Sequence, residues 1–104
     1  MRMMMKVSMP VDTANAAVRA GELGKKIQSI LEVMKPEAAY FVEEDGKRTG
    51  LIFFDMKDSS ELPAVAEPWF LAFNASLTVR PVMNLEDLAK AAPAMQRAVE
   101  AFGK

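Results

Sequence analysis

The spacing of apolar residues changes several times along this chain between the period of a helix and that of a strand. Residues 62–73 carry an almost complete stripe in which apolar residues recur every three or four positions. Residues 75–82, which follow directly, alternate between apolar and polar side chains, as in a half-buried strand. Because elements of both kinds have an apolar face to bury, the pattern predicts an α+β fold with one shared core.

Read in this way, the whole chain gives an order of elements. Alternating segments at 3–9 and 75–82, and segments rich in aromatic and β-branched residues at 38–43 and 49–56, predict four strands, with Asp45-Gly46 as the turn between the second and third. A long helix, capped by Asp12 or Thr13, is expected between the first two strands, with a bend or break near Gly21 and Gly24. The order β-α-β-β-α-β with right-handed crossovers predicts a ferredoxin-like antiparallel sheet with strands one and three in the middle.

Two further helix starts are predicted from capping residues. Ser59 or Ser60 is expected to cap the helix at 62–73, and Asn84, with Asp87, an extra C-terminal helix. Pro93 is expected to divide that helix into two short segments. Its apolar seam is expected to dock on the domain or on a partner, and it consists of Leu85, Leu88, Ala92, Met95, Val99 and Phe102.

The composition excludes several classes of function. The chain has 104 residues, which we read as one domain spanning 1–104, and it contains neither cysteine nor histidine. Disulfides, thiolate nucleophiles, zinc–thiolate sites and histidine ligands are therefore excluded, and we expect no cofactor or metal. Thirteen basic and fourteen acidic residues give a net charge of −1, so we expect binding to neither nucleic acid nor membranes. The lack of cysteine fits the reducing cytosol, so we expect a cytoplasmic protein. The apolar N-terminal segment is too short and too charged for a signal peptide or membrane span, and its several methionines leave the true start open.

The second face of the predicted sheet carries more apolar residues than a solvated face needs. Tyr40, Val42, Leu51 and Phe53 fall together on it if Asp45-Gly46 centres an even-length turn. A contiguous apolar patch on a small domain usually meets another surface. We therefore predict a homodimer in which two sheets pack face to face around a barrel-like core.

The same layout resembles a known superfamily. The stretch Ala66–Phe73, together with Val79-Arg80-Pro81-Val82-Met83 and Glu86-Asp87-Leu88, is similar to small uncharacterised bacterial proteins of the dimeric α+β barrel superfamily. The resemblance covers most of the chain and implies a homodimer. That superfamily includes cofactor-free monooxygenases, isomerases, haem degraders and ligand-sensing modules, so shared fold leaves the activity open. The lack of histidine excludes its haem-binding and histidine-dependent members.

The candidate ligand-binding residues each have a structural alternative. Lys6, Asp55 and Arg80 are expected at one end of the second face, either as an anion-binding cluster or as ion pairs at a dimer rim. Tyr40 could donate a hydrogen bond to a ligand, or it could simply pack on its strand with the hydroxyl group at the solvent-exposed edge. Aromatic residues, among them Trp69 and Phe53, could line a cavity or only fill the core and the interface.

These candidates support three hypotheses about function. The preferred one is a homodimeric protein that binds a small apolar or acidic metabolite in an apolar cavity, either between sheet and helices or at the dimer interface. The alternatives are a cofactor-free monooxygenase or isomerase and a non-catalytic dimeric interaction module. Whether the protein is an enzyme stays open at this stage.

Overall fold

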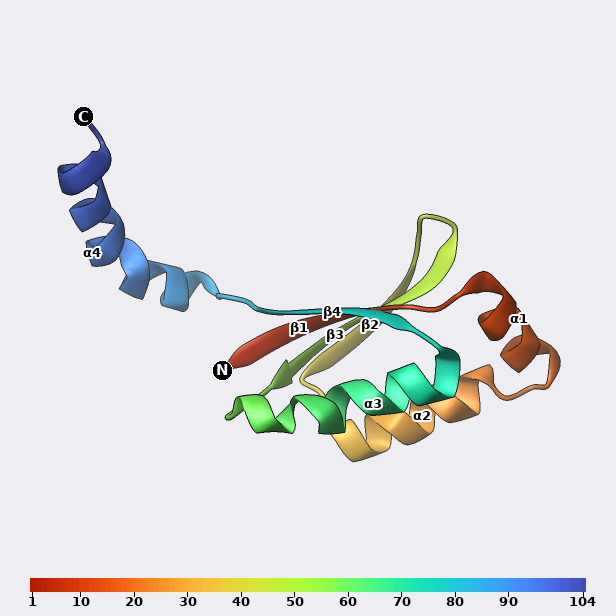
Figure 1. Ribbon diagram of the computed structural model, residues 1–104. Helices are drawn as coiled ribbons and strands as arrows, with labels where there is room; N and C mark the ends of the chain where they lie inside the picture. Colours follow the sequence, from red (N-terminus) through yellow and green to blue (C-terminus); the bar gives the residue numbers. More distant parts are fainter.

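The computed structural model describes residues 1–104, and its elements follow the order β-α-α-β-β-α-β-α (Figure 1). The elements are β1 Arg2–Ser8, α1 Val11–Arg19, α2 Leu23–Met34, β2 Ala38–Glu44, β3 Lys47–Asp55, a 3-10 turn Ser59–Glu61, α3 Leu62–Phe73, β4 Ser76–Pro81 and α4 Leu85–Phe102. The predicted α+β class and the four strands are confirmed. The helical region expected between the first two strands is divided into two helices, α1 and α2.

The four strands form one antiparallel sheet with the order β2-β3-β1-β4. β1 and β3 therefore lie in the middle, as predicted. α2 and α3 lie side by side beneath one face of the sheet, and α1 packs near the β2–β3 hairpin (Figure 1). No helix lies over the opposite face, which we call the open face.

The β2–β3 hairpin has the turn that the sequence predicts. Asp45 and Gly46 both adopt positive φ angles, 54° and 75°, and they join Glu44 and Lys47, which are paired across the hairpin. Two consecutive positive φ values define a type I′ turn, whose twist matches that of the flanking strands. The register of the hairpin follows from this turn.

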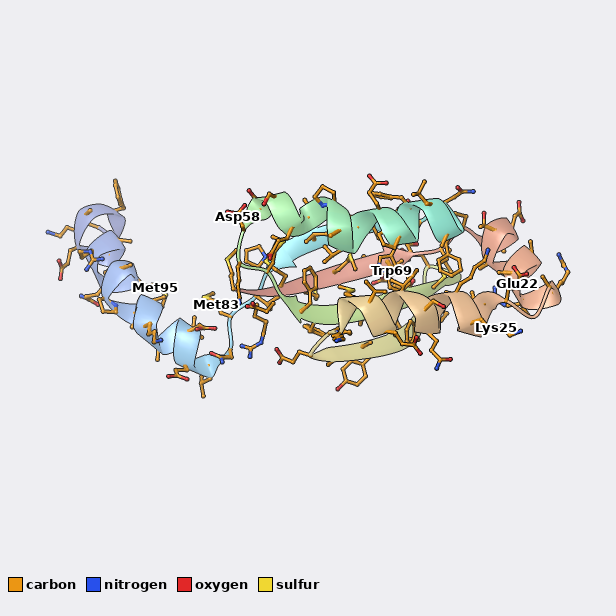
Figure 2. All side chains as sticks on the ribbon, turned by 90° about the horizontal axis from the view of Figure 1, so that it is seen from below. Glu22, Lys25, Asp58, Trp69, Met83 and Met95 are labelled. Carbon is orange, nitrogen blue, oxygen red and sulfur yellow. The ribbon has the colours of Figure 1, made fainter.

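The core lies between the sheet and the three helices. Met3, Met5, Val7 and Met9, which alternate along the chain, are all buried. From α3, Trp69 and Phe73 are fully buried and stack on each other, with ring centroids 6.1 Å apart. Figure 2 shows Trp69 between α2 and α3 in the view from the helix side. An apolar stripe along α2 packs against this core in a partly buried state, and it consists of Leu23, Ile27, Ile30, Leu31 and Met34.

The helix starts correct two predictions. α1 begins at Val11 with Pro10 as its N-cap and no side-chain cap, because the chain turns into the helix directly after β1; the expected cap at Asp12 or Thr13 is wrong. The cap expected at Ser59 or Ser60 is also wrong. A 3-10 turn precedes α3, and Asp58 caps that turn by accepting a hydrogen bond from the backbone N–H of Ser60.

The break in the first helical region is confirmed at Gly21. Its φ angle of 70° is one that residues with a side chain rarely adopt, so the chain can reverse there between α1 and α2.

The predicted division of the C-terminal helix at Pro93 is wrong, since α4 is one helix from Leu85 to Phe102. Its predicted docking on its own domain is also wrong, because the segment after β4 directs α4 off the end of the sheet (Figure 1).

Candidate functional site

The register of the strands defines the open face. Met4 is paired with Phe53 on one side and with Arg80 on the other, and Lys6 is paired in the same way with Leu51 and Thr78. Paired residues of adjacent strands share a face. The predicted second face is therefore confirmed, and it carries Met4, Lys6, Ser8, Tyr40, Val42, Leu51, Phe53, Asp55, Thr78 and Arg80.

The apolar part of the open face lies over β2 and β3. Tyr40 is 61 % exposed and Val42 is 44 % exposed, while Leu51 and Phe53 beside them are partly buried. Tyr40 stands directly across from Leu51. These four side chains form a contiguous apolar patch that no element of the chain covers.

The three charged candidates on the open face do not form one cluster. Lys6 pairs with Glu44 of β2 at 3.0 Å, and Arg80 makes no ion pair. Asp55 lies four residues beyond Leu51, the partner of Lys6, which is about 13 Å along a strand. The reason is that Lys6 sits in the middle of β1, and only the start of that strand lies beside the end of β3.

The aromatic candidates divide between the two faces. Tyr40 and Phe53 lie on the open face, whereas Trp69 is completely buried in the core beneath the other face. The indole Nε1–H of Trp69 has no hydrogen-bond partner. An unpaired buried donor of this kind costs about 1–3 kcal/mol. Trp69 borders none of the larger cavities, so its placement is that of a core residue.

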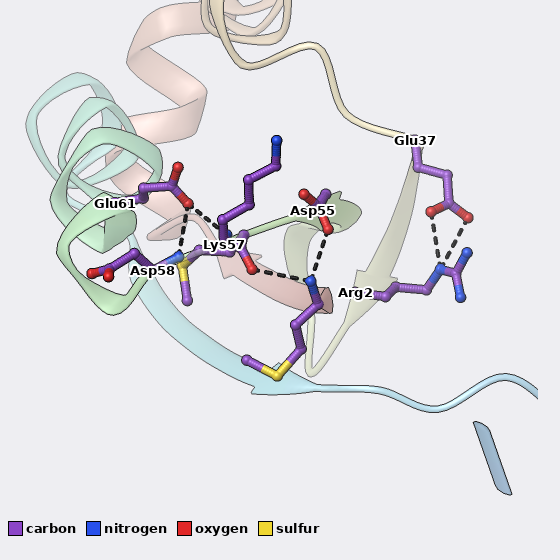
Figure 3. Close-up of polar contacts among 8 residues, drawn as sticks. Arg2, Glu37, Asp55, Lys57, Asp58 and Glu61 are labelled. Atoms are coloured by element: carbon purple, nitrogen blue, oxygen red, sulfur yellow. Dashed lines mark hydrogen bonds and ion pairs between the residues drawn. The ribbon is translucent and has the colours of Figure 1, made fainter. Parts of the chain in front are cut away.

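Polar contacts gather at the end of the sheet where β1 begins (Figure 3). Arg2 Nε lies 2.9 Å from a carboxylate oxygen of Glu37, and this hydrogen bond raises the pKa of Arg2. The Met1 amino group lies 2.8 Å from Asp55, and that hydrogen bond lowers the pKa of the Asp55 carboxyl. A cavity of about 380 Å³ lies among these residues. Because Arg2 and Asp55 are already paired, this end offers little free charge to a ligand.

A larger groove lies on the helix side, between the β2–β3 hairpin and the α1–α2 pair. Its volume of about 670 Å³ falls within the range of ligand sites, roughly 300–1,000 Å³. Met9, just after β1, and Leu23 and Ile27 of α2 contribute apolar side chains. Phe41 of β2 adds an aromatic ring that is about half exposed. The groove is thus an apolar recess that is open to solvent along one side.

One cation stands in this groove without a counter-ion. Arg48 of β3 donates from Nη1 to the side-chain oxygen of Asn15 in α1, at 2.8 Å, and it makes no ion pair. Its partner across the hairpin, Glu43, accepts a hydrogen bond from the backbone N–H of Gly46 at 2.8 Å instead. Asn15 therefore positions a guanidinium group beside apolar walls, an arrangement suited to a carboxylate on an apolar body.

The sequence of this chain matches a protein-family model. The model of the domain of unknown function DUF3303 matches residues 1–96. The chain belongs to the DUF3303 family. The match covers the sheet, α1–α3 and most of α4. No curated protein sequence matches it.

The groove of this DUF3303 domain was not predicted from the sequence, although a signal for Arg48 and Glu43 was present. Glu43 is two residues from Phe41 in β2, and Arg48 is four residues from Ile52 in β3, so both charged residues lie on the face of the sheet that the helices cover. A charged pair on the helix-covered face at the hairpin end marks a place where the helices do not reach. The partnership of Arg48 with Asn15 has no such signal, because it depends on how closely α1 approaches β3.

No group of three or more aspartate, glutamate, histidine or cysteine side chains is arranged to hold a metal ion. No helix combines the length and the apolar character needed to cross a membrane.

Proposed function

We propose that this DUF3303 protein binds a small carboxylic acid with an apolar body, in the groove between the hairpin and α1–α2. The observation that supports this most is Arg48, a cation held by Asn15 and left without a counter-ion beside apolar walls. A guanidinium group binds a carboxylate through two parallel hydrogen bonds, which adds geometric selectivity to the charge. The apolar walls then select for the remainder of the ligand.

The side chains that line the groove favour ligand binding over catalysis. Glu43 is its only acidic side chain, and Glu43 is already occupied with the backbone of the turn. A general base has to reach a substrate proton, and histidine, the usual base near neutral pH, is absent from the chain. A cofactor-free monooxygenase or isomerase therefore ranks below a binding protein.

The proposed working unit is a homodimer. We infer a variant of the ferredoxin-like split β-α-β arrangement, with two helices in the first crossover, and the central position of β1 and β3 supports it. Two such sheets packed through their open faces would form a dimeric α+β barrel. The uncovered patch of Tyr40, Val42, Leu51 and Phe53 supports this pairing. A purely structural dimer, with no ligand, is the second candidate that this patch favours.

The groove hypothesis is tested with 1-naphthoate and octanoate as probes, and with 1-naphthylmethanol as a neutral match. Isothermal titration calorimetry on the full chain should show saturable binding of at least one acid and much weaker binding of the alcohol. Replacing Arg48 with Ala should weaken acid binding about tenfold or more, as expected for a lost charge-assisted pair.

Lys47→Ala is the matched control. It removes the same charge one residue earlier, but its side chain lies on the open face, so acid binding should persist. Asn15→Ala should cause a smaller loss than Arg48→Ala, since Asn15 only positions the guanidinium. Absence of binding by both acids at millimolar concentration, or equal loss in Lys47→Ala, contradicts the proposed function.

A further inference from the structure

α4 is a helix with its own start signal but with no packing partner in its chain. Asn84 accepts from the backbone N–H of Asp87 at 2.8 Å, and Asp87 accepts in return from the backbone N–H of Asn84. None of its residues is buried, and five of its large apolar side chains are between 44 and 87 % exposed: Leu85, Leu88, Met95, Val99 and Phe102. Figure 2 shows Met95 well away from the body of the molecule.

The two sides of α4 differ in kind. The large apolar residues recur every three or four positions and so lie along one side of the helix. The ionisable residues lie on the other side, and they are Glu86, Asp87, Lys90, Arg97, Glu100 and, just beyond the helix, Lys104. Small residues such as Ala91 and Ala98 flank the apolar seam. This is the pattern of a helix that buries one broad face against protein.

α4 also lacks the means to be stable as an isolated helix. Pro93 in its interior removes one backbone hydrogen bond and crowds the preceding turn. Helices of this length are marginal in water even without a proline, and most helical stability in proteins comes from packing of the apolar face. A surface outside this chain is therefore required to explain α4.

A second copy fits that requirement better than a membrane or a nucleic acid does. α4 and its last residues carry three acidic and three basic side chains, so no net positive charge draws the helix to an anionic surface. In Figure 1 α4 rises on the side of the sheet opposite to α2 and α3, which is the side of the open face. A copy seated on the open face would thus lie next to α4.

The area needed by a dimer points in the same direction. Stable homodimer interfaces bury on the order of 2,000 Å² or more. The apolar patch of the open face consists of four residues, of which Leu51 and Phe53 are already partly buried. Two α4 helices would add ten large apolar side chains to the interface, five from each copy.

We propose that α4 is an exchanged arm, which packs its apolar side against the second copy of a homodimer. This inference rests on the homodimer of the proposed function and adds to it a named segment that holds the copies together. Because the two arms are related by the twofold axis of the dimer, each copy both supplies an arm and receives one.

The first test is photo-crosslinking on the full chain. A benzophenone side chain is placed at Met95, on the apolar side, or at Arg97, on the charged side, and unlabelled protein is mixed with ¹⁵N-labelled protein. We expect Met95 to yield hybrid crosslinks that join labelled and unlabelled chains, and Arg97 to yield at least fivefold fewer. Crosslinks from Met95 confined to its own chain overturn the proposal.

The second test measures the dimer dissociation constant by sedimentation equilibrium. The double variant Met95→Asp and Val99→Asp should raise this constant at least 100-fold, and the control Arg97→Asp should leave it within threefold. Phe53→Glu separates this inference from the proposed function. If Phe53→Glu dissociates the dimer but the double variant does not, the open-face dimer stands and the exchanged arm is overturned. A full chain that stays monomeric at high micromolar concentration overturns both.

Discussion

The ring of Phe41 lies directly over Gly50, its partner across the β2–β3 pair. A Cβ atom added to Gly50 would stand 3.3 Å from the Phe41 Cε1 atom. The missing side chain in β3 therefore lets the aromatic ring approach the backbone of Gly50 closely. Phe41 in turn forms one wall of the groove that contains Arg48.

Gly50→Ala and Gly50→Val should separate backbone effects from the position of this ring. Alanine in a strand gains about 0.5–1 kcal/mol over glycine in backbone entropy, which offsets the small shift of a half-exposed ring. We expect the urea midpoint of Gly50→Ala to stay close to that of the parent protein. Valine adds two methyl groups and should displace Phe41, so naphthoate binding should change while the fold persists. Unchanged binding in Gly50→Val would show that Phe41 does not shape the groove.

Phe53→Glu should convert the dimer to a folded monomer. In the single chain Phe53 is only partly buried, so a carboxylate there can stay hydrated, whereas a dimer would bury it without a partner. Light scattering should give twice the chain mass of 11.5 kDa for the parent protein and the single mass for the variant. Val33→Glu, at an 84 % exposed position on the helix side, is the control that should remain dimeric. A parent protein that is already monomeric contradicts this prediction.

Trp69→Phe should destabilise the domain far less than Trp69→Ala. The alanine variant leaves a large cavity in the core and is expected to cost about 3–5 kcal/mol. Phenylalanine keeps much of the ring and also removes the unpaired Nε1–H, which relieves a penalty of about 1–3 kcal/mol. Because Trp69 is the only tryptophan, unfolding should be followed by circular dichroism. Equal losses in the two variants would indicate that Nε1 has a hydrogen-bonding partner in solution.

Asp58 should contribute to stability at neutral pH and lose that contribution in acid. The hydrogen bond from the backbone N–H of Ser60 to its carboxylate lowers the pKa of Asp58 below the ordinary value of 3.8. The unfolded chain therefore takes up this proton first, so the contribution is present above pH 3.8 and disappears as the pH falls through the lower folded-state pKa. Asn at position 58 keeps an acceptor but cannot titrate. Urea unfolding at pH 6 and pH 3 should show a smaller acid loss in Asp58→Asn than in the parent protein.

Pro93→Ala should raise the helix content of residues 85–102. The substitution restores the hydrogen bond to Ala89 and removes a penalty of about 3 kcal/mol for an interior proline. Hydrogen exchange of the α4 amides should slow in this variant, most of all around position 93. Exchange that is already slow in the parent chain and does not change would mean that packing, and not intrinsic propensity, holds the helix.

The sheet and its two faces could be predicted from the sequence because strand side chains alternate and the Asp45-Gly46 turn sets the register. Lys6, Tyr40 and Phe53 were placed on the correct face for that reason. The separation of Lys6 from Asp55 along this face could not be predicted in the same way, since alternation assigns a face but not a position along it. The Arg48–Asn15 contact depends on the distance between α1 and β3, and the path of α4 depends on three residues, Val82–Asn84. Neither has a periodic signal.

The central position of β1 has a consequence for how the protein is made. Its hydrogen-bonded neighbours are β3 and β4, and both follow it in the chain, with Met3 paired to Phe54 and Pro81. During synthesis, β1 therefore emerges from the ribosome well before either of the strands that pair with its edges. Until Lys47–Asp55 has been translated, β1 is an apolar segment with two free edges. In that interval the nascent chain exposes an apolar strand with unpaired edges, which holding chaperones bind and which promotes aggregation.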